Sequence, residues 1–359
     1  MSNRKDELAP IEQTAIESKG DGRDLITNSR AQCFKLCPRK HYYSYVCGVR
    51  REQSAALRFG GAFHEALHLY KTTEDIDRAT SFLDDNYRAM IDATDSEERI
   101  ESLLLELVKV KVLLQGYIIR WADEPIEILE SEIQFDLPIV NPQTEKASRT
   151  YRNAGKIDAV AHYDGRLVIL EHKTTGDSIT TDSNYWDRLA LDEQISRYIL
   201  AARELGYDVG GVLYDVIRKP SIAPKLVGRG EDRRRESLVE YSERLSEDIG
   251  TRPSFYFARR EVVRFERELT EMRYEMWDIA KQIRQAERNN LHYKNSQSCR
   301  FPYPCAYLPL CVNQIDVENE ALPEGFERVQ NVNPELGETD DANSTTTAAA
   351  KISASTNTC

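Results

Sequence analysis

Apolar side chains recur at helical spacing in four long segments of the chain. In each segment they lie three or four residues apart, which places them on one face of an amphipathic helix. We therefore predict helices over residues 63–90, 100–121, 191–205 and 261–288.

Other segments have the pattern of β-strands. Residues 126–137 alternate between apolar and polar side chains, and residues 149–174 contain two strand-like runs around a tight turn. Residues 212–217 form a short apolar run after a turn that contains glycine, and residues 219–235 are basic and loop-like. This order of elements predicts an α/β fold with a central mixed sheet flanked by helices: helices come first, then three strands, a helix and a further strand.

The two ends of the chain differ from this middle part. Residues 1–25 are polar without periodicity, and residues 325–359 are acidic at first and then of low complexity. Such composition is typical of disordered segments. We therefore expect a single domain over residues 26–315 between two disordered ends.

The overall composition is that of a soluble globular protein, with 40% hydrophobic and 30% charged residues among 359. No apolar run approaches the ~20 residues of a membrane span, and the first residues lack the apolar stretch of a signal peptide. We therefore expect a protein of the cytoplasm that binds no membrane. The net charge is −12, but nine acidic and only two basic residues follow Cys311, so residues 1–311 carry only −5. A polyanionic ligand is therefore not excluded.

The strongest chemical pattern is a predicted hairpin. Asp164 and Gly165 stand between two strand-like runs, which is typical of a two-residue turn. This turn places Asp158 directly opposite Glu171, with their side chains on one face about 5 Å apart. Lys173 shares that face because side chains alternate along a strand.

Two carboxylates beside a lysine suit Mg²⁺ or Mn²⁺, which prefer oxygen ligands and can activate water next to a phosphate. The alternative is a surface hairpin with a cross-strand Glu–Lys pair. Both runs are apolar on both faces, which predicts a buried central pair. Unneutralised carboxylates would be costly there, so the metal site is favoured.

An ordered series of motifs resembles the RecB-type branch of the PD-(D/E)XK nucleases, which includes CRISPR-adaptation and phage exonucleases with an iron–sulfur cluster. The resemblance covers about residues 27–311. Its parts are Asn28-Ser29, Cys37-Pro38-Arg39, Tyr42-Tyr43, the segment 60–64 that ends at His64, Asp158, Glu171-His172-Lys173, and the Gln194/Tyr198 pair.

The resemblance implies a restriction-endonuclease-like core with helical insertions and a C-terminal segment clamped by cysteines. It also implies roles for single residues. The metal ligands would be His64, Asp158, Glu171 and the backbone carbonyl of His172, and Lys173 would assist the attacking water. Gln194 and Tyr198 lie four residues apart on one helical face, where they could contact DNA or the lysine.

Seven cysteines without a secretion signal favour thiols, metal ligands or a cluster over disulfides. The resemblance implies that Cys37 and three later cysteines, Cys299, Cys305 and Cys311, provide the four thiolates of a [4Fe–4S] cluster. Zinc is the alternative, although close C-x₂₋₄-C pairs are absent. Cys33 is the alternative to Cys37, and we interpret Cys47 and Cys359 as structural or free thiols.

We therefore predict a metal-dependent deoxyribonuclease, and we favour an exonuclease over an endonuclease. Its substrate would be single-stranded DNA or DNA ends, in recombination, repair or mobile-element processing. A helicase or recombinase is a plausible partner. One alternative is a zinc peptidase, because His64, Glu65 and His68 match H-E-x-x-H. Another is a non-catalytic DNA-binding protein that retains the nuclease fold.

Overall fold

The computed structural model describes residues 23–124, 126–228, 233–300 and 304–336. Its centre is a six-stranded sheet with the order β1-β4-β5-β6-β9, and β3 pairs with β4. The β1/β4 and β5/β6 pairs are parallel, and the other pairs are antiparallel. The predicted mixed α/β sheet is therefore confirmed. Its strands are β1 (Asp24–Ile26), β3 (Glu127–Val140), β4 (Ala147–Tyr163), β5 (Arg166–Thr175), β6 (Gly211–Arg218) and β9 (Phe257–Val263).

Strand β4 has two different neighbours along one of its edges. Strand β1 pairs with Tyr151–Asn153, and β5 pairs with Ala159–Tyr163. Strand β3 occupies the opposite edge of β4 along most of its length. Among the described strands, none pairs with residues 154–158 on the first edge, so the sheet is open beside Asp158.

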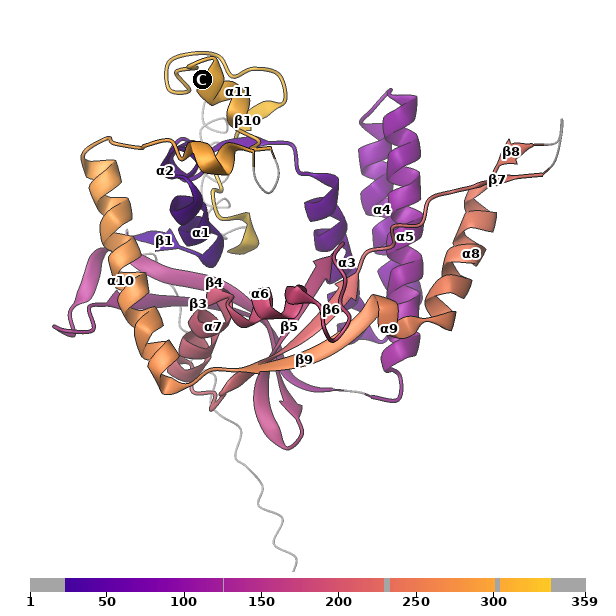
Figure 1. The fold of residues 1–359 in the computed structure, drawn as a ribbon, viewed down its shortest axis with the longest axis horizontal. Helices are drawn as coiled ribbons and strands as arrows, with labels where there is room; N and C mark the ends of the chain where they lie inside the picture. Colours follow the sequence, from indigo (N-terminus) through magenta and orange to yellow (C-terminus); the bar gives the residue numbers. More distant parts are fainter. Residues whose placement is uncertain (1–22, 125, 229–232, 301–303, 337–359) are drawn as a thin grey trace, which may run out of the picture.

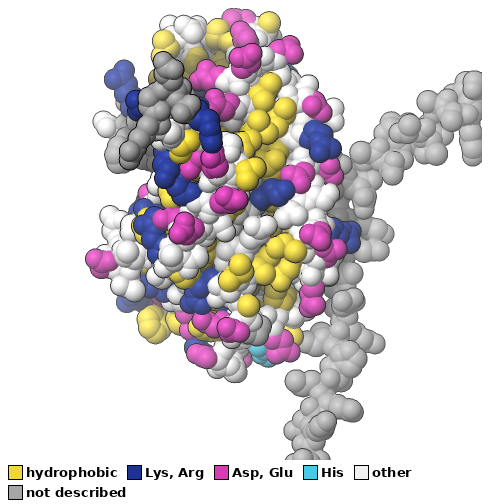
Figure 2. All heavy atoms as spheres, turned by 90° about the vertical axis from the view of Figure 1, so that its right-hand side faces the viewer, with side chains coloured by type: hydrophobic (Ala, Val, Ile, Leu, Met, Phe, Trp, Pro, Cys, Tyr) yellow, Lys and Arg dark blue, Asp and Glu magenta, His cyan; other side chains and the backbone are white. Residues whose placement is uncertain are grey.

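A layer of helices covers one face of the sheet and lies at the right of Figure 1. It contains α3 (Ala55–Thr73), α4 (Ile76–Asp92), α5 (Glu97–Trp121), α8 (Leu238–Thr251) and the short α9 (Pro253–Tyr256). Their buried side chains, among them Phe63, Leu113 and Ile249, pack against Ile217 and Phe257 of the sheet. On the outer surface of this side, apolar side chains form a band between charged ones (Figure 2).

The other face of the sheet is covered by α6 (Asn184–Ala190), α7 (Glu193–Glu204) and α10 (Glu266–Arg288). Trp186, Ile199 and Met272 from these helices are buried against Val160 and Ile169 of the sheet. The sheet is thus enclosed between two helical layers, and this burial supplies most of the core.

Segments from both ends of the chain meet in what we call the cysteine lobe, at the top of Figure 1. Strands β2 and β10 pair there in antiparallel fashion. Tyr43, Val49, Tyr307 and Leu310 form a small separate core. The lobe consists of α2 (Pro38–His41), the π-helical turn η1 (Tyr42–Val46), β2 (Val49–Arg51), η3 (Ser296–Cys299), α11 (Leu308–Val312) and β10 (Phe326–Arg328), joined to the sheet by α1 (Asn28–Leu36).

Several predicted elements differ in their extent. The helix expected over residues 63–90 is two helices, because Glu74 adopts a left-handed conformation after α3 and Asp75 then caps α4. The start of the helix expected over 261–288 belongs to β9, whose pairing with β6 is a tertiary contact that helical spacing does not reveal. Helix α8 was not predicted, although Ser237 and Glu240 form a capping box at its start.

The C-terminal part is also more structured than its composition indicates. Residues 325–336 were expected to lie in a disordered tail, but they contain β10 and the short η4 (Pro334–Leu336). The pairing of β10 with β2 joins positions 275 to 279 residues apart, which no local pattern can show. At the other end, residues 24 and 25 were expected to be disordered but belong to β1. The expectations for residues 1–22 and 337–359 lie outside the described residues. Within the described ranges, no helix combines the length and apolar character needed to cross a membrane.

Candidate active site

The predicted hairpin forms with the predicted register. Asp164 and Gly165 both have positive φ, as a type I′ turn requires, and the strands pair from Tyr163↔Arg166 to Ala159↔Leu170. Asp158 and Glu171 are the next opposed pair, and there the ladder ends. Asp158 has no partner in the β4/β5 ladder. Its side-chain atom Oδ2 accepts a hydrogen bond from the backbone N–H of His172 at 2.9 Å. The opening of the sheet thus brings the Asp158 carboxylate to the end of β5.

Glu171, Lys173 and Gln194 form a closed set of hydrogen bonds. Lys173 Nζ donates to Glu171 Oε1 at 2.8 Å and to Gln194 Oε1 at 2.6 Å. Gln194 Nε2 donates to the same Glu171 oxygen at 2.9 Å. The prediction that Glu171 and Lys173 share a face is confirmed, and the predicted contact of Gln194 with the lysine is present. Helix α7 supplies this contact from its first turn.

The two carboxylates have opposite electrostatic surroundings. Burial alone would raise the pKa of Asp158, but the hydrogen bonds from the ring and backbone of His172 and the nearby His64 ring outweigh it and hold this pKa well below its usual range. For Glu171, burial and the nearby Asp158 charge raise the pKa to about 8, although Lys173 opposes the shift. One carboxylate is therefore ionised, and its neighbour resists a second negative charge.

Helix α3 brings His64 to these residues. It approaches β5 closely at Gly60, where a Cβ atom would lie 2.8 Å from Thr174 Oγ1, so a larger residue would push the helix away. The ring of His64 lies 6.1 Å from the ring of His172. Burial lowers the pKa of His64 to about 4, although the Asp158 charge opposes this, so the ring is neutral and able to act as a metal ligand.

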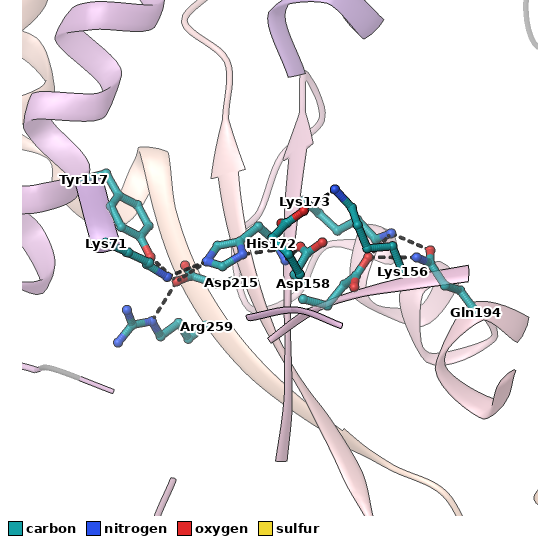
Figure 3. Close-up of polar contacts among 11 residues, drawn as sticks. Lys71, Tyr117, Lys156, Asp158, His172, Lys173, Gln194, Asp215 and Arg259 are labelled. Carbon is teal, nitrogen blue, oxygen red and sulfur yellow. Dashed lines mark hydrogen bonds and ion pairs between the residues drawn. The ribbon is translucent and has the colours of Figure 1, made fainter. Parts of the chain in front are cut away.

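A buried polar network that the sequence did not predict lies behind His172 (Figure 3). Nε2 of His172 lies 2.8 Å from Lys71 Nζ and 4.0 Å from Asp215 Oδ2. Asp215 is fully buried and accepts hydrogen bonds from Tyr117 and Arg259. A weak signal existed for Lys71, which follows His64 by seven residues and so lies on the same helical face.

All seven predicted catalytic and metal-binding residues line one cavity of about 520 Å³. Lys156, Lys219 and the first residues of α1 also border it, as does Glu335 from the C-terminal segment. A second cavity of about 250 Å³ lies on the other side of His64, Asp158 and His172. The residues shared with the predicted site are His64, Asp158, Glu171, His172, Lys173, Gln194 and Tyr198.

The H-E-x-x-H motif does not form a peptidase site in this arrangement. His64 and His68 border the second cavity, but Glu65 is exposed and lines neither cavity. A zinc peptidase needs that glutamate beside the bound water. The glutamate is on the wrong side of the helix for this chemistry.

The donor set suits a divalent cation. Among the described residues, no three His, Cys, Asp or Glu side chains are grouped so that they could hold a metal ion as they stand. However, Glu171 Oε2 is buried without a hydrogen-bond partner, and the repulsion between Glu171 and Asp158 raises the pKa of Glu171. A cation between these carboxylates would satisfy the oxygen and relieve the repulsion.

The four cysteines predicted to hold a cluster lie in the cysteine lobe or at its border, but no three of them are grouped in the described structure so that they could hold a metal as they stand. Cys37 Sγ accepts the backbone N–H of Asn295 at 3.4 Å, and Cys299 Sγ lies 3.7 Å from the carbonyl oxygen of the same residue. Cys305 and Cys311 both pack against the core of the lobe. Burial raises the pKa of the Cys33 thiol to about 11, although Lys40, Arg50 and a hydrogen bond with Ser44 oppose the shift. The choice of Cys37 over Cys33 stays a prediction.

A family profile of the PD-(D/E)XK nuclease superfamily matches residues 26–312. No curated protein matches the sequence. Among crystal structures, that of a protein provisionally described as an exonuclease, from Eubacterium rectale, has 12% identity and a TM-score of 0.42, covering 88% of this chain and 96% of that chain. The structure of SSO0001 has 12% identity and a TM-score of 0.31, covering 81% of this chain and 85% of that chain.

Proposed function

Because the chain belongs to the PD-(D/E)XK nuclease superfamily, we propose that it is a metal-dependent DNA exonuclease that hydrolyses phosphodiester bonds in the cavity beside β4 and β5. One observation carries the proposal. Asp158, Glu171 and Lys173 meet at the open edge of the sheet, and the lysine is held between Glu171 and Gln194. This set matches the residues that define the superfamily.

We assign the roles as follows. Asp158 and Glu171, with His64 and the His172 carbonyl, would hold Mg²⁺ or Mn²⁺, which supplies a Lewis acid for the phosphate and makes a bound water more acidic. Lys173 stays protonated, because Glu171 and Asp192 raise its pKa although burial opposes them. Its ammonium orients the attacking water and stabilises negative charge on the phosphate. Gln194 keeps the lysine in place, and Tyr198 borders the substrate's path.

A single strand or a DNA end is the substrate that suits this cavity. The cleavage residues lie inside a recess bordered by α1, α3 and α7 rather than on a flat surface. Lys156 and Lys219 at the recess can contact phosphates, and Tyr198 offers a ring close to the path of the bases. A strand with a free end can thread into such a recess, whereas an intact duplex would first have to open.

We further propose that the chain belongs to the RecB-type branch and that Cys37, Cys299, Cys305 and Cys311 hold a [4Fe–4S] cluster. The shared contact of Cys37 and Cys299 with Asn295 supports this. The cluster would tie the start of one nuclease domain, residues 26–315, to its end and so close a very long loop. It needs no redox role.

Processing of DNA in recombination, repair or mobile-element transfer is the setting that we propose, inside the cell and beside a helicase or recombinase. An exonuclease that acts on single strands needs unwound DNA, and a helicase supplies it. The non-catalytic alternative is decided by the cleavage experiment below.

Substitution of the lysine tests the nuclease directly. With Mg²⁺ or Mn²⁺, we expect the wild-type protein, purified without oxygen, to digest end-labelled single-stranded DNA, and EDTA to stop it. Lys173→Ala should reduce cleavage at least about a hundredfold, because the charge beside the phosphate is lost. Lys281→Ala, which removes an exposed lysine from α10, and His68→Ala should cleave normally. Absence of metal-dependent cleavage of DNA by the wild type would favour the non-catalytic alternative.

Removal of single cysteines tests the cluster. We expect about four iron and four sulfide atoms per wild-type chain, with the visible absorption of a [4Fe–4S] cluster. Cys37→Ser and Cys299→Ser should lose both, while Cys33→Ser and Cys47→Ser should retain them. Stoichiometric zinc in place of iron, or an intact cluster in Cys37→Ser, would refute the assignment.

A further inference from the structure

The network behind His172 is continuous across three strands and two helices. His172, Asp215 and Arg259 are neighbours in register on β5, β6 and β9, and they face the helical layer. From that layer, Lys71 of α3 reaches His172, and Tyr117 of α5 donates to Asp215 Oδ2 at 2.5 Å. Figure 3 shows this chain of contacts running from Arg259 towards Asp158. It connects the predicted metal site to the protein interior.

The contacts with Asp158 and Lys71 determine the tautomer of the His172 ring. Burial lowers the pKa of Lys71 to about 8, although the Asp215 charge opposes the shift. The geometry assigns the proton of the ring: Nδ1 faces the Asp158 carboxylate, which only accepts hydrogen bonds, so in the neutral ring the proton lies on Nδ1 and Nε2 accepts from Lys71 Nζ. Nδ1 lies 3.3 Å from Asp158 Oδ2. The ring N–H thus points at the carboxylate.

Two donors from one residue therefore converge on one oxygen of Asp158. The backbone N–H of His172 donates to Oδ2 at 2.9 Å, and the ring N–H approaches the same atom. Among the described contacts, no hydrogen bond engages Oδ1. This arrangement fixes the rotation of the carboxylate and leaves Oδ1 available to a cation.

We propose that Lys71 is a positioning residue of the nuclease: it holds His172 in the Nδ1–H tautomer, and His172 in turn clamps Oδ2 of Asp158 and directs Oδ1 to the metal. The inference rests on the proposed function and deepens it. Lys71 touches neither metal nor substrate. Its effect passes through His172, so it should alter metal affinity and turnover more than DNA binding.

Two variants of similar size separate hydrogen bonding from packing. Lys71→Gln keeps an N–H donor for Nε2, whereas Lys71→Met has none, and both lack the charge. We expect Lys71→Met to weaken Mn²⁺ binding, measured by electron paramagnetic resonance, about 10- to 100-fold and to lower kcat without raising KM for DNA. Lys71→Gln should lose clearly less. His68→Gln is the control, since His68 borders the same second cavity and its ring has no hydrogen bond among the described residues.

The tautomer can also be measured in the wild-type protein, which needs no variant. Nitrogen-15 spectra of the His172 ring should show Nδ1–H. The Nε2–H tautomer, or equal Mn²⁺ affinity in Lys71→Met and wild type, would overturn the positioning role while leaving the nuclease intact. Failure of the wild type to bind Mn²⁺ would overturn both the positioning role of Lys71 and the metal-dependent nuclease.

A second, independent observation concerns residues 329–336, which we call the C-terminal strap. The strap leaves the cysteine lobe at Val329, whose N–H donates to the Gly48 carbonyl, and Arg50 donates to the Val332 carbonyl. Gln134 of β3 then donates to the Leu336 carbonyl at 3.0 Å. The strap therefore runs from the lobe to the edge of the sheet and ends beside the cavity.

Glu335 of the strap borders the cavity that the cleavage residues line. Its carboxylate accepts a hydrogen bond of 2.6 Å from the hydroxyl of Thr27, the residue that caps α1. Lys156, Lys173 and Lys219 line the same cavity. A carboxylate among lysines at a helix N-terminus occupies a place that suits a phosphate.

We propose that the strap is autoinhibitory: Glu335 takes the place of a substrate phosphate, and the strap must move before a DNA strand can reach Asp158 and Lys173. This inference also rests on the proposed function. The proposal predicts that Glu335 and DNA compete for the cavity. The strap should therefore lower the apparent affinity for DNA and leave the cleavage rate of bound DNA unchanged.

The full-length Glu335→Gln variant tests the strap. In EDTA, its affinity for fluorescent single-stranded DNA should rise about fivefold or more over wild type, and with metal its KM should fall while kcat stays the same. Glu324→Gln removes the same charge from an exposed position and should change neither. Unchanged or weaker binding by Glu335→Gln, with normal cleavage by the wild type, would overturn the autoinhibition alone. Absence of DNA binding by every protein would overturn the nuclease as well.

Discussion

The repulsion between Asp158 and Glu171 is the constraint on which the site depends. Burial and the neighbouring Asp158 charge raise the pKa of Glu171, so a second negative charge at this place is unfavourable. The protein compensates in two ways. Two donors from His172 stabilise the charge on Asp158, and Lys173 with Gln194 surrounds one oxygen of Glu171. The other oxygen of Glu171 remains unsatisfied. A divalent cation would complete the compensation, so the same constraint that costs stability prepares the site for its metal.

The local part of this site could be predicted from the sequence because its rules are local. The Asp164-Gly165 turn fixes the register of two strands, and alternation then places Glu171 and Lys173 on one face. The four-residue spacing of Gln194 and Tyr198 on α7 is likewise local. The resemblance supplied His64, which no spacing rule connects to the hairpin.

The distant part could not be predicted because it depends on tertiary contacts. Lys71 and Asp215 reach His172 from elements that are remote in the sequence, and each alone has the properties of an ordinary charged residue. The end of strand β9 lies in a segment with helical spacing, and pairing with β6 decided its structure. The position of Glu335 depends on the pairing of β10 with β2. Composition alone placed β10 in a disordered tail.

The central claim is that Asp158 and Glu171 form one cation site, and thermal unfolding measures it most directly. A cation that binds only the folded protein raises the unfolding temperature. The account predicts that Mn²⁺ raises this temperature for the wild type and for Glu65→Gln, an exposed control on α3, but not for Glu171→Gln. An equal Mn²⁺-induced shift in Glu171→Gln, or no shift in the wild type, would contradict it.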